Sequence, residues 1–123
     1  MRQELVHYFT EKEKEFVNIL VSIGVRDNIA RVLVFISGTA QTTSHDIERG
    51  IDMRQPEVSL TLKYLLDKKW IRNHENIATR QGRPIKRYTL AKPISEIVDS
   101  IQEEKTAEMK HQMGLLVKLK KFV

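Results

Sequence analysis

Apolar residues recur every three or four positions in several stretches of this chain, and they alternate with polar residues in one region past its middle. The first helical stretch opens at Thr10, which together with Glu13 three residues later is typical of a capping box. Gly24 then suits the left-handed residue that ends many helices. The pattern therefore predicts a helix over residues 10–24, whose apolar positions are Phe16, Val17, Ile19, Leu20 and Ile23.

A second helical stretch runs from Asp27 to Ser37, and Gly38 is expected to end it in the left-handed conformation. Residues 39–43 are small and mostly hydroxylated, which suits either a loop or a very short strand. Ser44 is expected to cap a short third helix that Gly50 ends. The inward positions of these two helices are Ala30, Leu33, Val34, Ile36 and Ile47.

The fourth helical stretch follows after a turn of a few residues and has two different sides. Pro56 suits a first helical turn, so we expect a helix over about residues 55–68. One side is an apolar stripe that can bury against a core: Val58, Leu62, Leu65 and Leu66. The other side is polar with a single acid: Gln55, Glu57, Ser59, Leu60, Thr61, Lys63 and Tyr64. Two helices joined by so short a turn are typical of a helix-turn-helix.

Beyond residue 70 the spacing changes from helical to alternating, and two strand-like stretches flank Gly82 and Pro84. This pattern predicts a β-hairpin over about residues 71–90. Its tip carries Arg80 and Arg83, and its second strand carries Lys86 and Arg87. Taken alone, an arginine-tipped hairpin favours a simpler interpretation, a solvated turn whose charges prevent aggregation.

The chain from residue 93 onward predicts one long helix, about 40 Å in length at 1.5 Å per residue. Its apolar residues lie mostly three or four positions apart: Ile94, Ile97, Val98, Ile101, Met109, Met113 and Leu116. One small domain cannot cover so long a stripe, which favours a dimerisation helix over residues 93–123. The alternative is a helix folded back on its own domain. Charged residues near the middle predict a mixed interface rather than a regular coiled coil.

Composition places the chain among ordinary globular proteins. Its 123 residues allow one domain over residues 1–92 with the long helix appended, and 41% are hydrophobic and 30% charged. No apolar run approaches the roughly 20 residues that span a bilayer. The chain has no cysteine, and its N-terminus lacks an apolar segment of the secretory type. We therefore expect a cytoplasmic protein that does not insert into membranes.

The distribution of charge is more informative than the net charge of +5. Residues 54–92 contain ten lysines or arginines and three acids, a local charge of +7, whereas the rest of the chain has a charge of −2. A basic block confined to one segment of a globular domain indicates that the segment binds a polyanion.

Other chemistry finds no support in the sequence. The four histidines, His7, His45, His74 and His111, are scattered without metal-ligand spacing. There is no glycine-rich phosphate loop and no nucleophile elbow. We therefore expect no enzyme activity, no metal site and no cofactor, and the sequence identifies no small-molecule effector.

The order of these elements, with an amphipathic QPEVSLTLKYLL helix followed by a hairpin ending in GRPIKRYTLA, resembles the winged helix-turn-helix of prokaryotic ArsR-, MarR- and TrmB-type transcriptional regulators. The resemblance covers about residues 26–92. It implies a mainly α fold with a small β-hairpin wing (α+β), in which residues 55–59 open the recognition helix and residues 71–90 form the wing. The chain departs from many ArsR-type proteins in lacking cysteines, and from full-length TrmB-type proteins in lacking a long C-terminal effector domain.

A helix fits the major groove, where each base pair displays a distinct pattern of donors and acceptors. We expect the following residues near the bases or the groove edge: Arg54, Gln55, Glu57, Leu60, Thr61 and Tyr64. Ser59 and Lys63 are expected on phosphates. Glu57 has two interpretations of equal weight, because it can accept from a cytosine amino group or balance the dipole of its own helix.

The wing arginines Arg80 and Arg83 are long enough to enter an adjacent minor groove, whereas Lys86 and Arg87 are expected on phosphates or in solvent. The sequence thus predicts a homodimeric regulator that binds specific double-stranded DNA. The alternative is a winged-helix module that binds a protein or RNA in a larger assembly.

Overall fold

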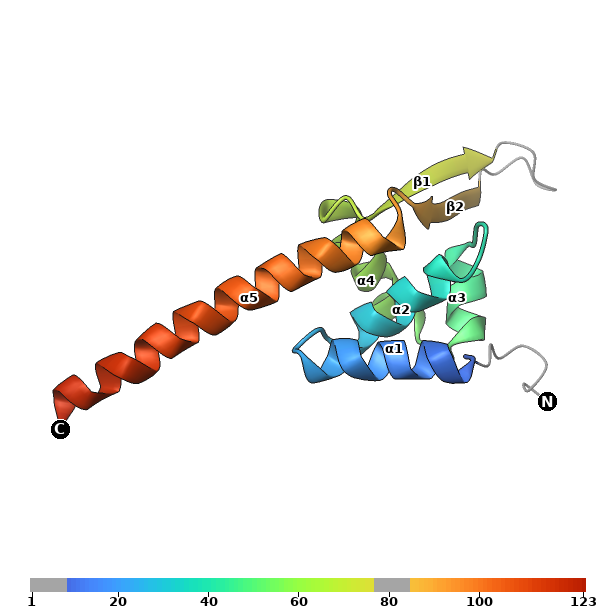
Figure 1. Ribbon diagram of the computed structural model, residues 1–123. Coiled ribbons are helices and arrows are strands. Elements are labelled where there is room, and N and C mark those ends of the chain that lie inside the picture. Colours follow the sequence, from blue (N-terminus) through green and yellow to red (C-terminus); the bar gives the residue numbers. More distant parts are fainter. Residues whose placement is uncertain (1–8, 77–84) are drawn as a thin grey trace. The chain divides into compact units, whose positions relative to one another are not determined.

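The computed structural model describes residues 9–76 and 85–123, and the chain divides into two compact units, Met1–Lys92 and Pro93–Val123 (Figure 1). The described part of the first unit contains α1 (Glu11–Ser22), α2 (Asp27–Ser37), α3 (Ser44–Gly50), α4 (Gln55–Asp67), β1 (Ile71–Asn76) and β2 (Ile85–Leu90). The second contains α5 (Ile94–Leu119) and the short 3-10 helix η2 (Lys120–Phe122). The fold is the mainly helical winged helix-turn-helix with a long C-terminal helix that the sequence predicts.

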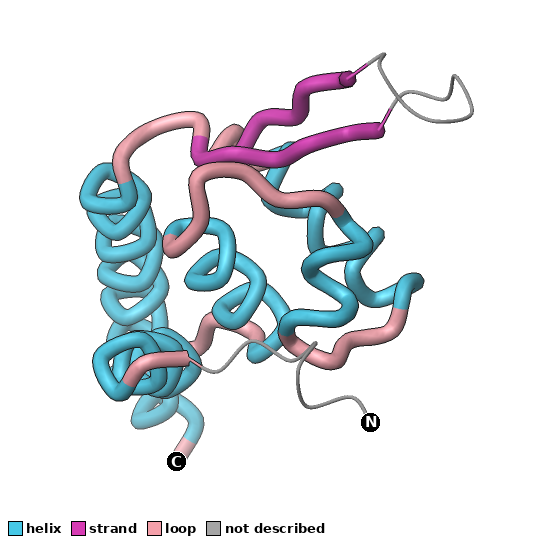
Figure 2. Tube along the Cα trace, turned by 90° about the vertical axis from the view of Figure 1, so that its right-hand side faces the viewer, coloured by secondary structure: helices cyan, strands magenta, loops and turns pink. Residues whose placement is uncertain are grey.

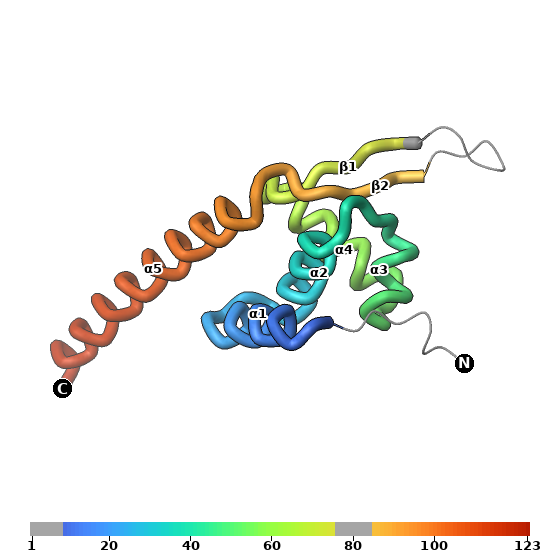
Figure 3. The backbone as a smooth tube through the Cα atoms, turned by 45° about the vertical axis from the view of Figure 1, so that its right-hand side comes forward, coloured from blue at the N-terminus to red at the C-terminus, as the bar shows by residue number. Residues whose placement is uncertain are grey.

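Helix α2 is the central element of the first unit. Every residue from Ile29 to Ile36 is buried except Arg31, so the helix is apolar on nearly all sides. Such a helix is stable only when other elements surround it. It contacts α1, α4 and β2, and Figure 3 shows α1, α3 and α4 around it. The core positions that the sequence predicts here, Leu33 with Ile47 of α3 and Leu62 of α4, are confirmed.

Arg31 ties α2 to the turn between α3 and α4. Its Nε donates to the carboxylate of Asp27 at 2.9 Å, and its Nη1 donates to the carbonyl of Ile51 at 3.2 Å. Within that turn Asp52 has a positive φ of 54° and is exposed between Ile51 and Met53, which are both buried. The two buried flanks and the arginine therefore fix the angle at which α4 follows α3.

The predicted ends of α1 are confirmed. The backbone N–H of Glu13 donates to the Thr10 hydroxyl at 3.1 Å, and the Glu13 carboxylate accepts from the Thr10 N–H at 2.9 Å. Gly24 has a φ of 103°, and the N–H of Val25 donates to the carbonyl of Leu20 at 2.9 Å. These bonds form a Schellman motif, in which glycine takes the left-handed position without steric cost.

The apolar side of α1 is narrower than predicted. Val17 and Leu20 are buried, but Ile19 and Ile23, which the periodicity assigns to the core side, are exposed. Contact with α2 through one stripe accounts for this difference, because residues beside the stripe reach past α2 into solvent.

Two predicted caps are wrong. Gly38 has a φ of −91° rather than a left-handed conformation. A Cβ at position 38 would lie 2.8 Å from Oε2 of Glu13, which is the end of a flexible side chain, so neither the backbone conformation nor space requires a glycine there. The cap of α3 is Thr43 rather than Ser44: the N–H of Asp46 donates to the Thr43 hydroxyl at 3.1 Å, and the Asp46 carboxylate accepts from the Thr43 N–H at 3.3 Å.

The hairpin pairs β1 with β2 in antiparallel register, from Ile71 opposite Leu90 to Asn76 opposite Ile85 (Figure 2). Of the two alternatives open for residues 39–43, the structure selects a minimal strand, because Thr42 forms a β-bridge with Tyr88. The Tyr88 N–H donates to the Thr42 carbonyl at 2.7 Å, and the Thr42 N–H donates to the Tyr88 carbonyl at 3.1 Å. The bridge thus joins the hairpin to the segment before α3.

Helix α4 ends in a second Schellman motif, and here the left-handed residue is not glycine. Lys69 has a φ of 64°, and the N–H groups of Lys69 and Trp70 donate to the carbonyls of Leu66 and Leu65 at 2.9 and 3.1 Å. The buried side chains of Trp70 and Leu65 supply the apolar contact that accompanies this motif. A lysine therefore occupies a conformation that costs free energy for any residue with a Cβ.

Helix α5 changes character along its length. Ile97 and Ile101 are buried, Ile94 and Val98 are half-buried, and every residue from Thr106 to Val123 is exposed. Among the described residues, no helix is long and apolar enough to cross a membrane.

Burial raises the pKa of the Tyr88 hydroxyl above its ordinary value of 10.0 because the phenolate would lose its hydration. The unfolded chain therefore releases this proton first as the pH rises. The stability that the neutral Tyr88 contributes is fully present below about pH 10 and is lost as the pH passes through the raised value. We expect Tyr88→Phe to reduce the fall in unfolding free energy between about pH 9 and pH 11, measured by urea denaturation.

The exposed tyrosine variant Tyr64→Phe is the matched control, since it carries the same chemical change outside the core. Equal alkaline destabilisation of Tyr88→Phe and the parent protein would contradict this account.

Candidate nucleic-acid interface

The exposed face of α4 is polar, weakly charged and fixed from behind. Val58, Leu62 and Leu65 are buried on the opposite side of the helix and hold it against α2 and α3. The exposed side chains are those of Arg54, Gln55, Glu57, Ser59, Leu60, Lys63 and Tyr64. Because the buried stripe fixes the rotation of the helix, these side chains point outward together.

Thr61 does not belong to this face, so its predicted position near the bases is wrong. Its side chain is 5% exposed, and its hydroxyl donates to the carbonyl of Glu57 at 2.7 Å. A threonine in a helix satisfies its hydroxyl in this way when the side chain turns toward the core. The helical periodicity places residue 61 at the edge of the apolar stripe. Its side chain is small enough to be buried beside that stripe.

The second interpretation of Glu57 agrees with its position. It lies in the first turn of α4, and its Oε1 accepts from the backbone N–H of Arg54 at 3.4 Å. This is one half of a capping box, because an arginine side chain has no acceptor with which to return the bond. The carboxylate also balances the positive end of the helix dipole, so the one acid on this face is explained by the helix itself.

Tyr64 is held at the far end of the face by its neighbours. Its ring lies edge-on to the ring of Trp70, with 6.4 Å between centroids and an interplanar angle of 81°. The Nζ of Lys68 lies 6.0 Å from the Tyr64 centroid and 5.1 Å from the Trp70 centroid. Such edge-to-face and cation–π contacts orient an aromatic ring that would otherwise be free to turn.

Lys63 remains accessible for an anion. Its Nζ lies 3.8 Å from Oδ2 of Asp67, and the two side chains are 74% and 69% exposed. Exposed ion pairs of this kind contribute little, about 0.2–1 kcal/mol at most. A phosphate therefore competes easily with Asp67 for this ammonium group.

Leu60 is the most exposed apolar side chain of α4, at 71%. It stands beside a hollow of about 150 Å³ between α4 and the start of α2, lined by Arg26, Asn28, Ile29, Glu57, Leu60, Thr61 and Tyr64. Arg26 and Asn28 are not among the site residues that the sequence predicts. They lie about thirty residues before α4 in sequence, and no spacing rule links them to it; only the packing of α2 against α4 brings them together.

The wing is described in part. Arg80 and Arg83 lie outside the described residues. Lys86 is exposed and Arg87 is half-buried on β2, where they lie opposite Glu75 and His74 of β1. Arg72 of β1 is also exposed, and its Nη2 donates to the carbonyl of Ala91 at 3.2 Å. Arg72 and Lys69 are further exposed basic residues of the segment 54–92 that are not among the predicted site residues.

No group of three or more metal-ligating side chains is clustered in the part of the chain that the structure describes. What the arrangement offers is a rigid, exposed helix face with donors, one apolar side chain and few acids, next to a hairpin.

No protein-family model matches the chain, and no curated protein matches its sequence. Among solved structures, the chain is similar to a possible transcriptional regulator from Methanosarcina mazei Go1, with a TM-score of 0.61 and 14% identity over 85% of this chain and 86% of that one. It is also similar to a MarR family transcription regulator, with a TM-score of 0.55 and 16% identity over 90% and 80% of the two chains. These similarities establish the winged-helix fold.

Proposed function

We propose that this chain is a transcriptional regulator that binds specific double-stranded DNA as a homodimer. The observation that carries the proposal is the exposed face of α4, which is fixed from behind by the core and presents donors with a single acid, already engaged at its own helix end. An exposed helix of this width fits the major groove of DNA. The names of the two similar structures, a possible transcriptional regulator and a MarR family transcription regulator, support the same function.

On α4 we assign Arg54, Gln55, Leu60 and Tyr64 to the bases or the groove edge, and Ser59 and Lys63 to phosphates. Leu60 offers a methyl-bearing surface that matches the C5-methyl group of thymine. Thr61 has no part in this contact because it is buried. The wing extends the contact to an adjacent minor groove, with Arg80 and Arg83 at the groove and Lys86 and Arg87 near the backbone.

A homodimer is part of the proposal because a single winged helix buries only about 600–1,000 Å², less than most specific complexes. The surface for a second copy is the exposed part of α5, which includes the predicted residues Met109, Met113 and Leu116. The predicted residues Ile97 and Ile101 are buried in the single chain and are not assigned to this surface. Such a regulator acts on the chromosome, so we place it in the cytoplasm.

Selection of bound sequences from random genomic duplexes tests the function. We expect an inverted repeat, because a twofold dimer presents two α4 helices to half-sites about one helical turn, or 34 Å, apart. Enrichment of no duplex sequence would contradict the proposal, and a preference for single-stranded RNA when both are offered in competition would favour an interaction module.

Salt titration tests the phosphate contacts. Affinity for the selected duplex is expected to fall steeply with salt, and Lys63→Ala is expected to lower the slope of log affinity against log salt by about 0.9 for each phosphate that the lysine neutralises in the parent protein. Lys12→Ala is the matched control, because Lys12 is an exposed helical lysine on α1, outside the α4 face. Equal slopes for both variants would remove Lys63 from the interface.

Replacing thymine by uracil tests Leu60. Uracil lacks the C5-methyl group, and burial of one methyl group is worth about 0.8 kcal/mol, or roughly a fourfold difference in affinity. We expect the parent protein to lose this much affinity when uracil replaces thymine at one base position of each half-site. The affinity of Leu60→Ala is expected not to change with the same replacement. Ile85→Ala serves as the control for removal of an exposed apolar side chain on the wing. If Leu60→Ala and the parent respond equally to uracil, Leu60 does not read the methyl group.

A further inference from the structure

The charges of the Pro93–Val123 unit are divided into two blocks of equal length. Residues 94–108 carry one lysine against five acids, a net charge of −4: Lys105 against Glu96, Asp99, Glu103, Glu104 and Glu108. Residues 109–123 carry four lysines and no acid, a net charge of +4: Lys110, Lys118, Lys120 and Lys121. The sign changes between residues 108 and 109, and fifteen residues lie on each side of that point.

The basic block also presents a large apolar surface. Its exposed apolar residues are Met109, Met113, Leu115, Leu116, Val117, Leu119, Phe122 and Val123, with exposures from 49% to 99%. Contiguous apolar surface of this extent usually marks an interaction site. A shallow groove on this surface is lined by Gln112, Leu115, Leu116, Lys118, Leu119 and Phe122.

We propose that the α5 helices of two copies pair in antiparallel orientation, about a twofold axis that passes between residues 108 and 109. The proposal rests on the homodimer of the proposed function and specifies its geometry. The axis places the acidic block of each copy against the basic block of the other. In this register Glu96 lies opposite the partner's Lys121, and Asp99 lies opposite the partner's Lys118.

Charge decides between the two orientations. In an antiparallel pair each −4 block faces a +4 block at both ends of the interface, so the net Coulomb interaction between the two helices is attractive. In a parallel pair the acidic blocks would face each other and so would the basic blocks. Like charges opposed across an interface select against that arrangement.

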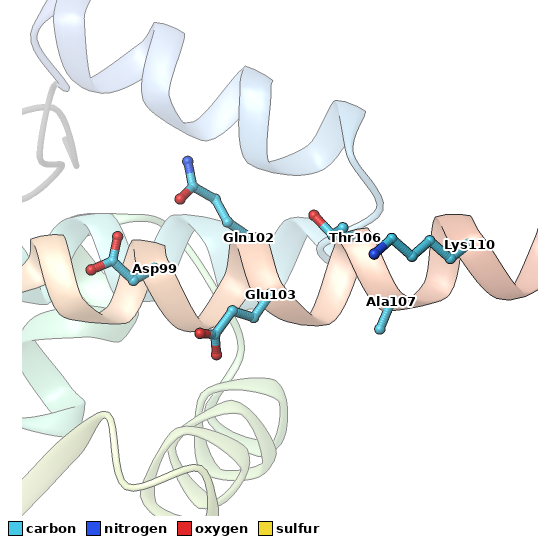
Figure 4. A pocket seen from close by; sticks show the side chains of 6 residues that line it. All are labelled: Asp99, Gln102, Glu103, Thr106, Ala107 and Lys110. Carbon is cyan, nitrogen blue, oxygen red and sulfur yellow. The ribbon is translucent and has the colours of Figure 1, made fainter.

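The middle of α5 suits a close crossing. Figure 4 shows six side chains along its exposed surface, where Asp99 and Glu103 lie toward one end, Lys110 toward the other, and the small Thr106 and Ala107 between them. Gly114 adds to this. A Cβ at position 114 would meet no atom of the described residues within 4 Å, so none of them requires a glycine there. In the antiparallel register it lies opposite the partner's Glu103, where a missing side chain leaves room for the carboxylate.

The basic apolar block taken alone also fits the surface of an anionic membrane. That alternative gives no role to the acidic block, which anionic lipids would repel. A second copy of the chain accounts for both blocks, so the observations favour self-pairing.

Distances between spin labels test the orientation in the full-length protein. The chain has no cysteine, so Asp99→Cys, Glu108→Cys and Lys118→Cys each carry one label per copy. Residue 108 lies next to the axis. The distance between its two labels is therefore expected to equal the interhelical distance of about 8–10 Å plus the length of the linkers that attach the labels to the backbone. Residues 99 and 118 each lie about nine to ten residues from the axis, so both pairs are expected near 30 Å at about 1.5 Å per residue.

Each other outcome overturns the proposal. Short distances at all three positions indicate a parallel pair, and a long distance at residue 108 indicates a dimer that does not cross there. Absence of dipolar coupling together with a monomer in sedimentation indicates no self-pairing. If that monomer also binds phosphatidylglycerol vesicles but not phosphatidylcholine vesicles, the basic block is a membrane surface instead.

A charge-exchanged variant tests the electrostatic cause without changing the net charge. It carries Glu96→Lys, Asp99→Lys and Glu103→Lys together with Lys118→Glu, Lys120→Glu and Lys121→Glu. The variant is mixed with the parent protein, and heterodimers are counted by native mass spectrometry. If the helices pair in antiparallel orientation, fewer heterodimers form than random exchange of subunits would give. If they pair in parallel orientation, more form. Circular dichroism and thermal unfolding of each protein alone verify that both fold.

Titration of the same labelled proteins with the selected duplex separates this inference from the proposed function. Antiparallel distances without DNA binding leave the inference standing and remove the proposed function. DNA binding by a dimer with parallel helices removes the inference alone.

Discussion

Burial of α2 is the constraint on which the first unit depends. A helix that is apolar on nearly every side cannot face water, so α1, α4 and β2 must all cover it. Each covering element keeps one side free. For α4, the free side is the polar face with Leu60 and Lys63, and its rotation is set by Val58, Leu62 and Leu65 on the side that meets the core. The proposed DNA-binding face is thus rigid because its back is part of the core.

Periodicity and local cap chemistry are sufficient to predict most of this fold. The helices, the region of the hairpin and the Thr10 capping box follow from spacing and from residue types that act on neighbours in sequence. The left-handed Lys69 could not be predicted, because nothing in its residue type marks it. Its conformation is imposed by Trp70 and Leu65, whose burial closes the turn. The bridge between Thr42 and Tyr88 likewise depends on tertiary packing and has no local signal.

The candidate site was likewise predictable from the sequence only in part. Helical spacing correctly predicts the exposed face of α4 except at Thr61, because a residue at the edge of a stripe can turn either way. The sequence supports two roles for Glu57, and its hydrogen bond to the backbone of Arg54 favours the one at the helix end. Arg26 and Asn28 reach the site only through the packing of α2 against α4, which no local pattern contains.

The C-terminal unit follows a different rule from the core. Packing in the core depends on the size and shape of apolar side chains. It does not depend on the order of charged residues along the surface of a helix. Along α5 the apolar surface alone would permit a second copy to pair in either direction. The separation of five acids from four lysines at one point of the sequence removes that freedom, because only one orientation brings opposite charges together. In the proposed dimer, the order of the charges along α5 therefore determines the direction in which the two helices pair.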